Sequence, residues 1–310
     1  MKNRIVSFLP SATELIYELG AQNELFGVTH ECKYPLDAEK KPQIISSVID
    51  SEKLSSKEIN DATCRLLNEG KDIFQINEKN LIEANPSIII SQETCEVCAA
   101  YTNQLNKAIQ ILGRRPEIFS MDPHSMDEII DSVKQLGQLI DKENQADFLI
   151  SNLKDRIRKI KKFEKKFSPK VLAIEWLDPF FTAGHWVPEM IDTAGGRNLI
   201  SLPGEHSRRM SFDEIKNSDP EKIILMPCGF DVKRTKIEYK KILESNSEWA
   251  TLNAVKNDEI YGVDANSFFS KPSIRTIEGL EILSKIINPD RKSTRLNSSH
   301  SSVSRMPSSA

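Results

Sequence analysis

Apolar and polar positions along the chain follow a repeating order of short apolar run, polar turn and amphipathic segment. Apolar runs at 4–9, 25–29, 87–91 and 117–121 are typical of buried strands. The segments 11–20, 77–86 and 99–113 have apolar residues at helical spacing. Ser11 and Glu14 are expected to form a capping box at the start of the first helix, and Gly20 to end it.

The same order restarts in the second half of the chain. It predicts strands at 170–176, 222–226 and 259–263, and helices at 187–196, 210–220, 233–244 and 273–287. Residues 124–167 are helical by pattern, with a break at 141–144. Alternating strands and helices imply parallel sheets covered by helices. We therefore expect an α/β fold with one lobe at 1–141, a linking helix within 142–167 and a second lobe at 168–290.

The last twenty residues, 291–310, differ from the rest of the chain. They are rich in serine, show no periodicity and resemble translated vector sequence. We expect this tail to be disordered, and His300 within it is left out of the candidate site.

Composition limits the classes of function. The 310 residues are 39% hydrophobic and 28% charged with a net charge of −3, which is typical of a globular protein and makes nucleic acid a poor partner. No apolar run is long enough to span a membrane, and the apolar run near the start stops at Pro10, too short for a secretory leader. With this N-terminus, the chain is expected to be a cytoplasmic monomer. It is expected to be extracytoplasmic if a leader precedes Met1 in the natural protein.

Unusual side chains collect just after the expected strands. His30, Glu31 and Cys32 follow one strand, Gln92 to Cys98 follow another, and His124 comes two residues after Asp122. In parallel sheets the carboxyl ends of the strands form the ligand crevice. The same rule brings in the aromatic segment 177–190 and Phe268 and Phe269 of the second lobe. Cys64, on a helical face, is expected to pack in the core, and the role of His206 stays open.

The pair Cys95 and Cys98 has three interpretations. It is part of a ligand-binding wall, or it is a thiol redox couple near the start of a helix, where exposed amides favour the thiolate. A third possibility is a zinc site made by His30, Cys32, Cys95 and Cys98, because thiolate and imidazole are common zinc ligands.

Five segments, "RIVSFLPSATELIYELG", "LFGVTHECKYP", "SIIISQETCEVCA", "LDPFFTAGHWVPEMIDTAGGRNL" and "FFSKPSIRTIEGLEIL", carry a family resemblance. Over residues 3–289 the chain resembles ABC-transporter substrate-binding proteins of the cobalamin/iron-siderophore type, closest to the cobalamin-binding-like branch. The resemblance implies two Rossmann-like lobes joined by a backbone helix, with a ligand cleft between them. It implies a binding protein and not an enzyme, with cobalamin or another corrinoid as ligand, or a related chelate of iron such as haem or a siderophore.

The resemblance also implies roles for particular residues. Together with the clustering of side chains at strand ends, it gives these candidate ligand contacts: Ser11, His30, Glu31, Cys32, Gln92, Cys95, Cys98, Trp176, Phe180, Phe181, His185, Trp186, Glu189, Phe268 and Phe269. In this family an acidic residue on each lobe docks on a membrane permease, and the matching residues are Glu78, Asp213 and Glu214. Lys79 departs from the family pattern, because it occupies the position where the acid usually stands.

Overall fold

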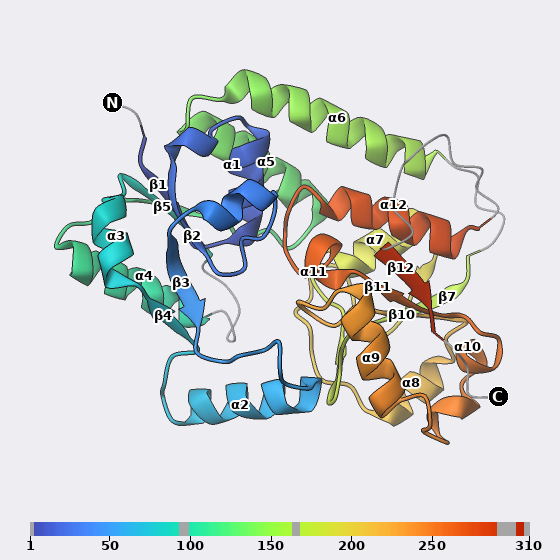
Figure 1. The fold of residues 1–310 in the computed structure, drawn as a ribbon. Coiled ribbons are helices and arrows are strands. Elements are labelled where there is room, and N and C mark those ends of the chain that lie inside the picture. Colours follow the sequence, from blue (N-terminus) through green and yellow to red (C-terminus); the bar gives the residue numbers. More distant parts are fainter. Residues whose placement is uncertain (1–2, 93–98, 163–167, 290–301, 307–310) are drawn as a thin grey trace. The chain divides into compact units, whose positions relative to one another are not determined.

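The computed structural model describes residues 3–92, 99–162, 168–289 and 302–306, except for the side chains of 99–102. The chain divides into two compact units (Figure 1). The first comprises Met1–Leu54, Glu58–Pro123 and Glu128–Ser151, and the second comprises Ser55–Lys57, His124–Asp127 and Asn152–Ala310. Two short segments from the first half of the chain therefore belong to the second unit, which the expected lobe boundaries did not include.

The first unit is built on a six-stranded sheet in the order β4-β3-β2-β1-β5-β6. Neighbouring strands are parallel except for the pair β3 and β4. The strands are β1 (Ile5–Ser7), β2 (Leu25–Thr29), β3 (Gln43–Ser47), β4 (Phe74–Ile76), β5 (Ile88–Ser91) and β6 (Glu117–Ser120). The helices that belong wholly or largely to this unit are α1 (Pro10–Glu18), α2 (Ser56–Asn68), α3 (Glu78–Ala84), α4 (Ala99–Leu112) and α5 (Met126–Leu139).

Helix α1 begins differently from the prediction. Pro10 occupies the first helical turn, Leu9 is the N-cap, and no side chain caps the helix. The expected capping box of Ser11 and Glu14 is therefore wrong, because proline suits the first turn, where its missing N–H has no partner to lose. The predicted end is confirmed by Gly20, whose φ of 70° is the left-handed conformation that glycine adopts readily.

The second unit contains a sheet in the order β12-β11-β10-β7-β8, and β9 pairs with β7. The pairs β7–β10, β10–β11 and β7–β9 are parallel. The strands are β7 (Lys170–Leu177), β8 (Phe180–Thr182), β9 (Arg197–Asn198), β10 (Lys222–Leu225), β11 (Ile260–Val263) and β12 (Val303–Arg305). The helices are α7 (Val187–Ala194), α8 (Phe212–Ser218), α9 (Val232–Ile242), α10 (Asn253–Lys256), α11 (Ala265–Phe268) and α12 (Thr276–Ile287).

Helix α6 (Glu143–Lys161) carries the chain from the first unit into the second. Its 19 residues span about 28 Å at the usual helical rise. In the second unit Arg156 of α6 donates two hydrogen bonds to Glu281 of α12, from Nε to Oε1 at 2.8 Å and from Nη2 to Oε2 at 2.9 Å. The predicted α/β architecture with a linking helix is therefore confirmed.

One segment of the expected tail is ordered. Residues 303–305 form β12, which pairs antiparallel with β11, and the Met306 side chain is buried over Gly262. The prediction of disorder is wrong for this segment, because β12 satisfies the backbone groups of the β11 edge and Met306 joins the apolar core.

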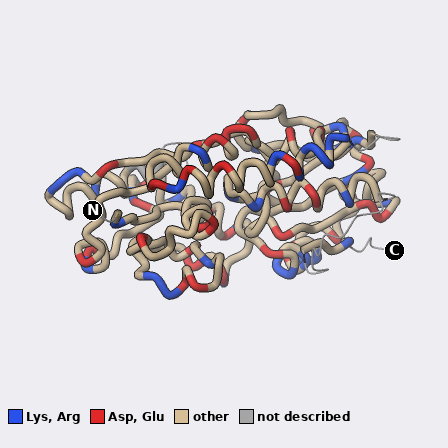
Figure 2. The backbone as a smooth tube through the Cα atoms, turned by 90° about the horizontal axis from the view of Figure 1, so that it is seen from above, with Lys and Arg blue, Asp and Glu red and all other residues tan. Residues whose placement is uncertain are grey.

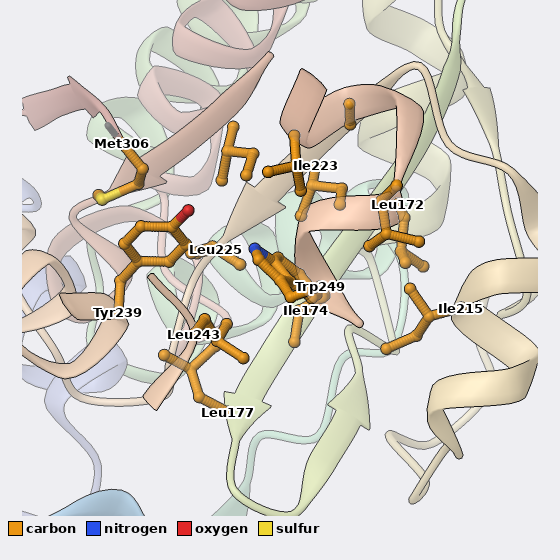
Figure 3. Packing of buried hydrophobic residues seen from close by; sticks show 14 of the residues in the cluster. Leu172, Ile174, Leu177, Ile215, Ile223, Leu225, Tyr239, Leu243, Trp249 and Met306 are labelled. Carbon is orange, nitrogen blue, oxygen red and sulfur yellow. The ribbon is translucent and has the colours of Figure 1, made fainter. Parts of the chain in front are cut away.

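The core of the second unit lies on the face of the sheet covered by α8, α9 and α10. Leu172, Ile174 and Leu225 from the strands meet Tyr239 of α9 and the fully buried Trp249 (Figure 3). In the first unit a separate cluster packs Val6, Ile44 and Ile89 of the strands against Leu81 of α3 and Ala108 of α4. Each unit therefore has its own hydrophobic core.

Basic and acidic residues are interspersed along the chain (Figure 2). Among the described residues, no helix is both long and apolar enough to cross a lipid bilayer.

Candidate functional site

The carboxyl edge of the first sheet brings together the ends of β1, β2, β5 and β6. His30 directly follows β2, and Ser91 and Ser120 are register partners at the ends of β5 and β6. His30 Nδ1, Ser91 Oγ and Ser120 Oγ are buried and have no hydrogen-bond partner among the described residues. Buried polar atoms are normally satisfied, so this edge offers three polar contacts to a ligand or to water. Gln92 lies at the same edge, as predicted from the strand order.

Cys32 is buried and contacts two threonines of the protein interior. Its side chain is 3% exposed, and Sγ lies 3.1 Å from Thr13 Oγ1 and 3.3 Å from Thr29 Oγ1. The thiol therefore joins the end of β2 to α1, and contact with a ligand would require it to leave these partners. Ser11 is also buried in α1, whereas Glu31 is exposed.

Cys95 and Cys98 lie outside the described residues, so the zinc and redox interpretations stay predictions. Cys64 lies on α2 and is only half-buried, so the expected core position is wrong.

Three predicted aromatic contacts pack against other residues of the second unit. Phe180 stacks on Trp249 with ring centroids 5.9 Å apart, Phe268 packs beneath Arg275, and Phe269 is 3% exposed. The strand rule placed Phe180 at a strand end, but the segment after β7 turns back to form β8, antiparallel to β7. Phe181 of β8 faces Arg209, whose guanidinium carbon is 5.7 Å from the ring centroid.

Trp176 is a half-exposed aromatic residue near the carboxyl end of β7. Its ring meets that of Phe230, which follows β10, edge to face with centroids 5.4 Å apart. Trp176 Nε1 donates to the Ser56 carbonyl at 3.2 Å, and Glu238 Oε1 accepts from Ser56 N and Oγ at 2.7 and 2.6 Å. These bonds fix the orientation of the Trp176 ring. Phe230 could not be predicted from the sequence, because it lies beyond the strand end, in a loop without a motif.

Three histidines from separate segments converge in the second unit. His124 precedes α5, His185 lies between β8 and α7, and His206 lies in the loop before α8. His124 Nδ1 and His185 Nδ1 are 3.1 Å apart, and the ring centroids are separated by 5.1 Å, 5.2 Å and 5.1 Å. One ligand nitrogen from each ring lies within 4.8 Å of the others. We refer to His124, His185 and His206 as the histidine cluster.

Two loops of the histidine cluster are fastened to one another through their backbones. His185 N donates to the Glu205 carbonyl at 2.6 Å, and Gly204 N donates to the His185 carbonyl at 2.9 Å. Glu175 Oε2 accepts from Ser207 Oγ at 2.6 Å and from Gly184 N at 3.4 Å. Gly184 allows this approach, because a Cβ there would lie 2.5 Å from Glu205 O and from Ser207 N.

The third segment is attached through Glu189 of α7. Its Oε2 accepts from Met126 N at 3.0 Å, which holds the start of α5, and with it His124, beside α7. Trp186 is only 6% exposed and stacks obliquely on His185, and its Nε1 has no hydrogen-bond partner among the described residues. Of the predicted contacts, His185, Trp186 and Glu189 are thus brought together, whereas His206 was left open because its loop carries no periodic signal.

The predicted docking acids differ in how available they are. Glu78 and Asp213 are exposed in the first turns of α3 and α8. Glu214 accepts from Ser211 N in a capping box and pairs with Arg208 at 2.9 Å, and these two interactions lower the pKa of its carboxyl. Asp213 is therefore the carboxylate of α8 that is open to a partner. Lys79 pairs loosely with Glu83 at 4.0 Å.

Two surface hollows lie elsewhere. One, of about 320 Å³, is in the first unit and includes Asp72, Gln104 and Lys107. The other, of about 730 Å³, is in the second unit and includes Lys170, Asp219 and Glu259. Neither contains a residue of the histidine cluster.

Two α/β units with largely parallel sheets, connected by one long helix, define the architecture of a two-lobe binding protein. The sequence matches the family described as "Periplasmic binding protein" over residues 5–267, and the chain belongs to this family.

Three relatives illustrate the similarity. YvrC of Bacillus subtilis (strain 168), named an uncharacterized ABC transporter substrate-binding lipoprotein, is 25% identical over 303 residues, which cover 93% of this chain and 80% of the relative. The crystal structure of Staphylococcus aureus IsdE complexed with heme superposes with a TM-score of 0.70 at 18% identity, covering 93% of this chain and 100% of that chain. The periplasmic vitamin B12 binding protein BtuF of Vibrio cholerae gives 0.66 at 18%, covering 93% and 98%.

These comparisons confirm the resemblance seen in the sequence. The chain is a substrate-binding protein and not an enzyme, as its family and YvrC indicate. YvrC is named a lipoprotein and BtuF periplasmic, so the relatives give no support to a cytoplasmic location.

Proposed function

We propose that this protein is the extracytoplasmic substrate-binding component of an ABC importer and that its ligand is a corrinoid or haem. The observation that carries the proposal is the family match over residues 5–267, together with relatives of the same fold that are named for vitamin B12 and for heme. Both ligands are large flat metal chelates with apolar surfaces and polar edges.

The described residues contain groups suited to such a ligand. The half-exposed Trp176 ring, supported by Phe230 at 5.4 Å, offers an aromatic face near the ends of β7 and β10. His30, with its buried Nδ1, offers an imidazole at the carboxyl edge of the first sheet. Aromatic faces bind flat apolar ligands, and imidazole is a common ligand of cobalt and iron. The position of the ligand between the two lobes stays a prediction.

The ligand proposal is tested by titrating the purified full-length chain with cyanocobalamin, aquocobalamin and haemin. We expect one equivalent of one of these chelates to bind, with a shifted absorption spectrum and quenched tryptophan fluorescence. The proposal fails if none of the three produces a spectral shift or calorimetric heat.

Trp176→Ala tests the aromatic face. Loss of an aromatic contact of about 0.5–1.5 kcal/mol corresponds to roughly 2- to 12-fold weaker binding. Phe148→Ala is the matched control, because Phe148 is an aromatic residue of α6 that is 77% exposed. Equal affinities of the two variants would remove Trp176 from the binding surface.

We also propose that the exposed carboxylates Glu78 and Asp213 contact the permease of the importer. Each lies in the first turn of a short helix on a different unit, and Glu214 is already engaged by Ser211 and Arg208.

A further inference from the structure

We propose that the histidine cluster binds one divalent transition-metal ion, such as Zn²⁺, directly through three imidazole nitrogens. Its residues, His124, His185 and His206, all belong to the second unit, and their sequence separations are too large for a local motif. The inference is independent of the proposed chelate, because it concerns a metal ion held by the protein itself.

The distances are close to those of a metal site. Two nitrogens bound to one zinc ion at 2.0–2.1 Å with tetrahedral angles lie about 3.4 Å apart. The Nδ1 atoms of His124 and His185 are 3.1 Å apart, and the ligand nitrogen of His206 lies within 4.8 Å of both other ligand atoms. His206 is exposed on a loop, so a side-chain rotation can supply the remaining movement of about 1.4 Å.

The contact between His124 and His185 needs a proton when no metal is bound. Two neutral imidazoles that share a hydrogen bond need an N–H on one Nδ1 and a lone pair on the other. A metal ion ligated by both Nδ1 atoms takes the place of that proton and uses both lone pairs. The same geometry therefore accommodates either a shared proton or a metal ion.

The backbone around His185 is held in a conformation that a histidine does not prefer. Its φ of 55° is in the left-handed region, which is sterically unfavourable for a residue with a side chain. The two backbone hydrogen bonds to residues 204 and 205 and the carboxylate of Glu175 oppose this cost. Strain of this kind is concentrated at binding sites, where the surrounding structure enforces a required side-chain position.

The donor set indicates which metals fit. Three neutral nitrogens suit zinc, cobalt, nickel and copper, whereas magnesium and calcium prefer oxygen donors. Three protein ligands also leave a fourth position open to water or to a donor atom of another molecule, in contrast to closed structural zinc sites. The cluster is therefore a nitrogen-only site for a borderline metal with one exchangeable position.

The experiment uses the untagged full chain, stripped of metal with a chelator and titrated with Zn²⁺ against a chromophoric competitor. Metal content after gel filtration gives the stoichiometry, and Co²⁺ substitution gives a visible d–d spectrum that reports nitrogen ligation. We expect one metal ion per protein. The protein has five histidines; His300→Ala is the matched control outside the cluster, and His30→Ala tests whether the metal binds instead at the alternative zinc site that includes His30.

The test variants are His185→Asn and His206→Ala. Asparagine tolerates the left-handed backbone of position 185, so this change removes the imidazole with little added strain. His206 is exposed, so its replacement leaves folding intact and keeps the test valid if His185→Asn unfolds. Both variants should bind Zn²⁺ at least about 100-fold more weakly. Even the loss of a residue that only hydrogen-bonds to a metal ligand lowers metal affinity about 10- to 100-fold.

The results separate this inference from the proposed function. Stoichiometric Zn²⁺ that is lost in both cluster variants and retained in His300→Ala and His30→Ala supports the site, whatever the chelate titration shows. The site is overturned if no metal remains bound at one equivalent, if the two variants bind as tightly as the wild type, or if His30→Ala loses the metal equally.

Discussion

Replacement of Gly184 by alanine tests whether the loops of the histidine cluster are fastened as tightly as the contacts indicate. Gly184 lies between β8 and His185, and its backbone approaches residues 205–207. A Cβ at this position would lie 2.5 Å from Glu205 O, 2.5 Å from Ser207 N and 2.8 Å from His206 C. Ordinary van der Waals contact is 3.4–4 Å, and all three atoms belong to the backbone, so the loop must retreat by about 1 Å.

The cost follows from the interactions that the retreat would break. The hydrogen bonds from His185 N to Glu205 O and from Gly204 N to His185 O contribute about 1 kcal/mol each. The bond from Ser207 Oγ to the Glu175 carboxylate is charge-assisted and would lengthen as well. With part of these lost, we expect the free energy of unfolding to fall by about 3 kcal/mol, which corresponds to a melting temperature lower by roughly 6–12 °C.

The assay is thermal unfolding by circular dichroism, with Zn²⁺ affinity measured on the same samples. Gly70→Ala is the control, because Gly70 has a φ of 63° and no atom within 4 Å of an added Cβ. It should cost about 1–2 kcal/mol through its left-handed backbone alone and leave Zn²⁺ binding unchanged. A Gly184→Ala protein with the melting temperature and Zn²⁺ affinity of the wild type would refute the close packing of these loops.

Two further predictions concern α6 and the permease. Glu281→Gln removes the negative charge that binds the half-buried Arg156 and raises the pKa of its guanidinium. In a denaturant titration this change should lower the free energy of unfolding by about 1.5–3 kcal/mol. The control Asp155→Asn, at the exposed pair with Arg158, should change it by less than about 0.5 kcal/mol. Equal effects would show that the pair of Arg156 and Glu281 has no special role. Asp213→Lys should reduce ligand uptake in cells that carry the cognate importer without changing ligand affinity in solution, and unchanged uptake would exclude Asp213 from docking.

Much of the fold was predictable because its signals are local. The buried strands β1, β2, β5, β7 and β10 are short apolar runs, and the ends of α1, α7 and α8 carry glycine or a capping box within a few residues. The strands β4 and β8 have only three residues each, too few to show a periodic pattern of apolar residues. Each is recognised as a strand only through its antiparallel pairing with β3 or β7. The error at Ser11 arose because two capping signals overlap there and Pro10 prevails.

The candidate site was less predictable, because it depends on side-chain direction and on contacts between distant segments. Cys32 follows a strand as expected, but its thiol points to Thr13 and Thr29 and is buried. Phe180 follows β7, but the antiparallel return of β8 packs it on Trp249. A rule based on strand ends gives the position of a residue along the sheet and gives no information on which way its side chain points.

By itself, the sequence determined the alternation of strands and helices, the division into two α/β parts, the linking helix and the family resemblance. These properties depend on the periodicity of neighbouring residues and on motifs a few residues long. Only the tertiary structure decided that His124, His185 and His206 meet, since 61 residues separate the first two and no local pattern relates them. Their approach requires the absent side chain of Gly184, the carboxylates of Glu175 and Glu189, and the left-handed backbone of His185, which act together only after the chain has folded.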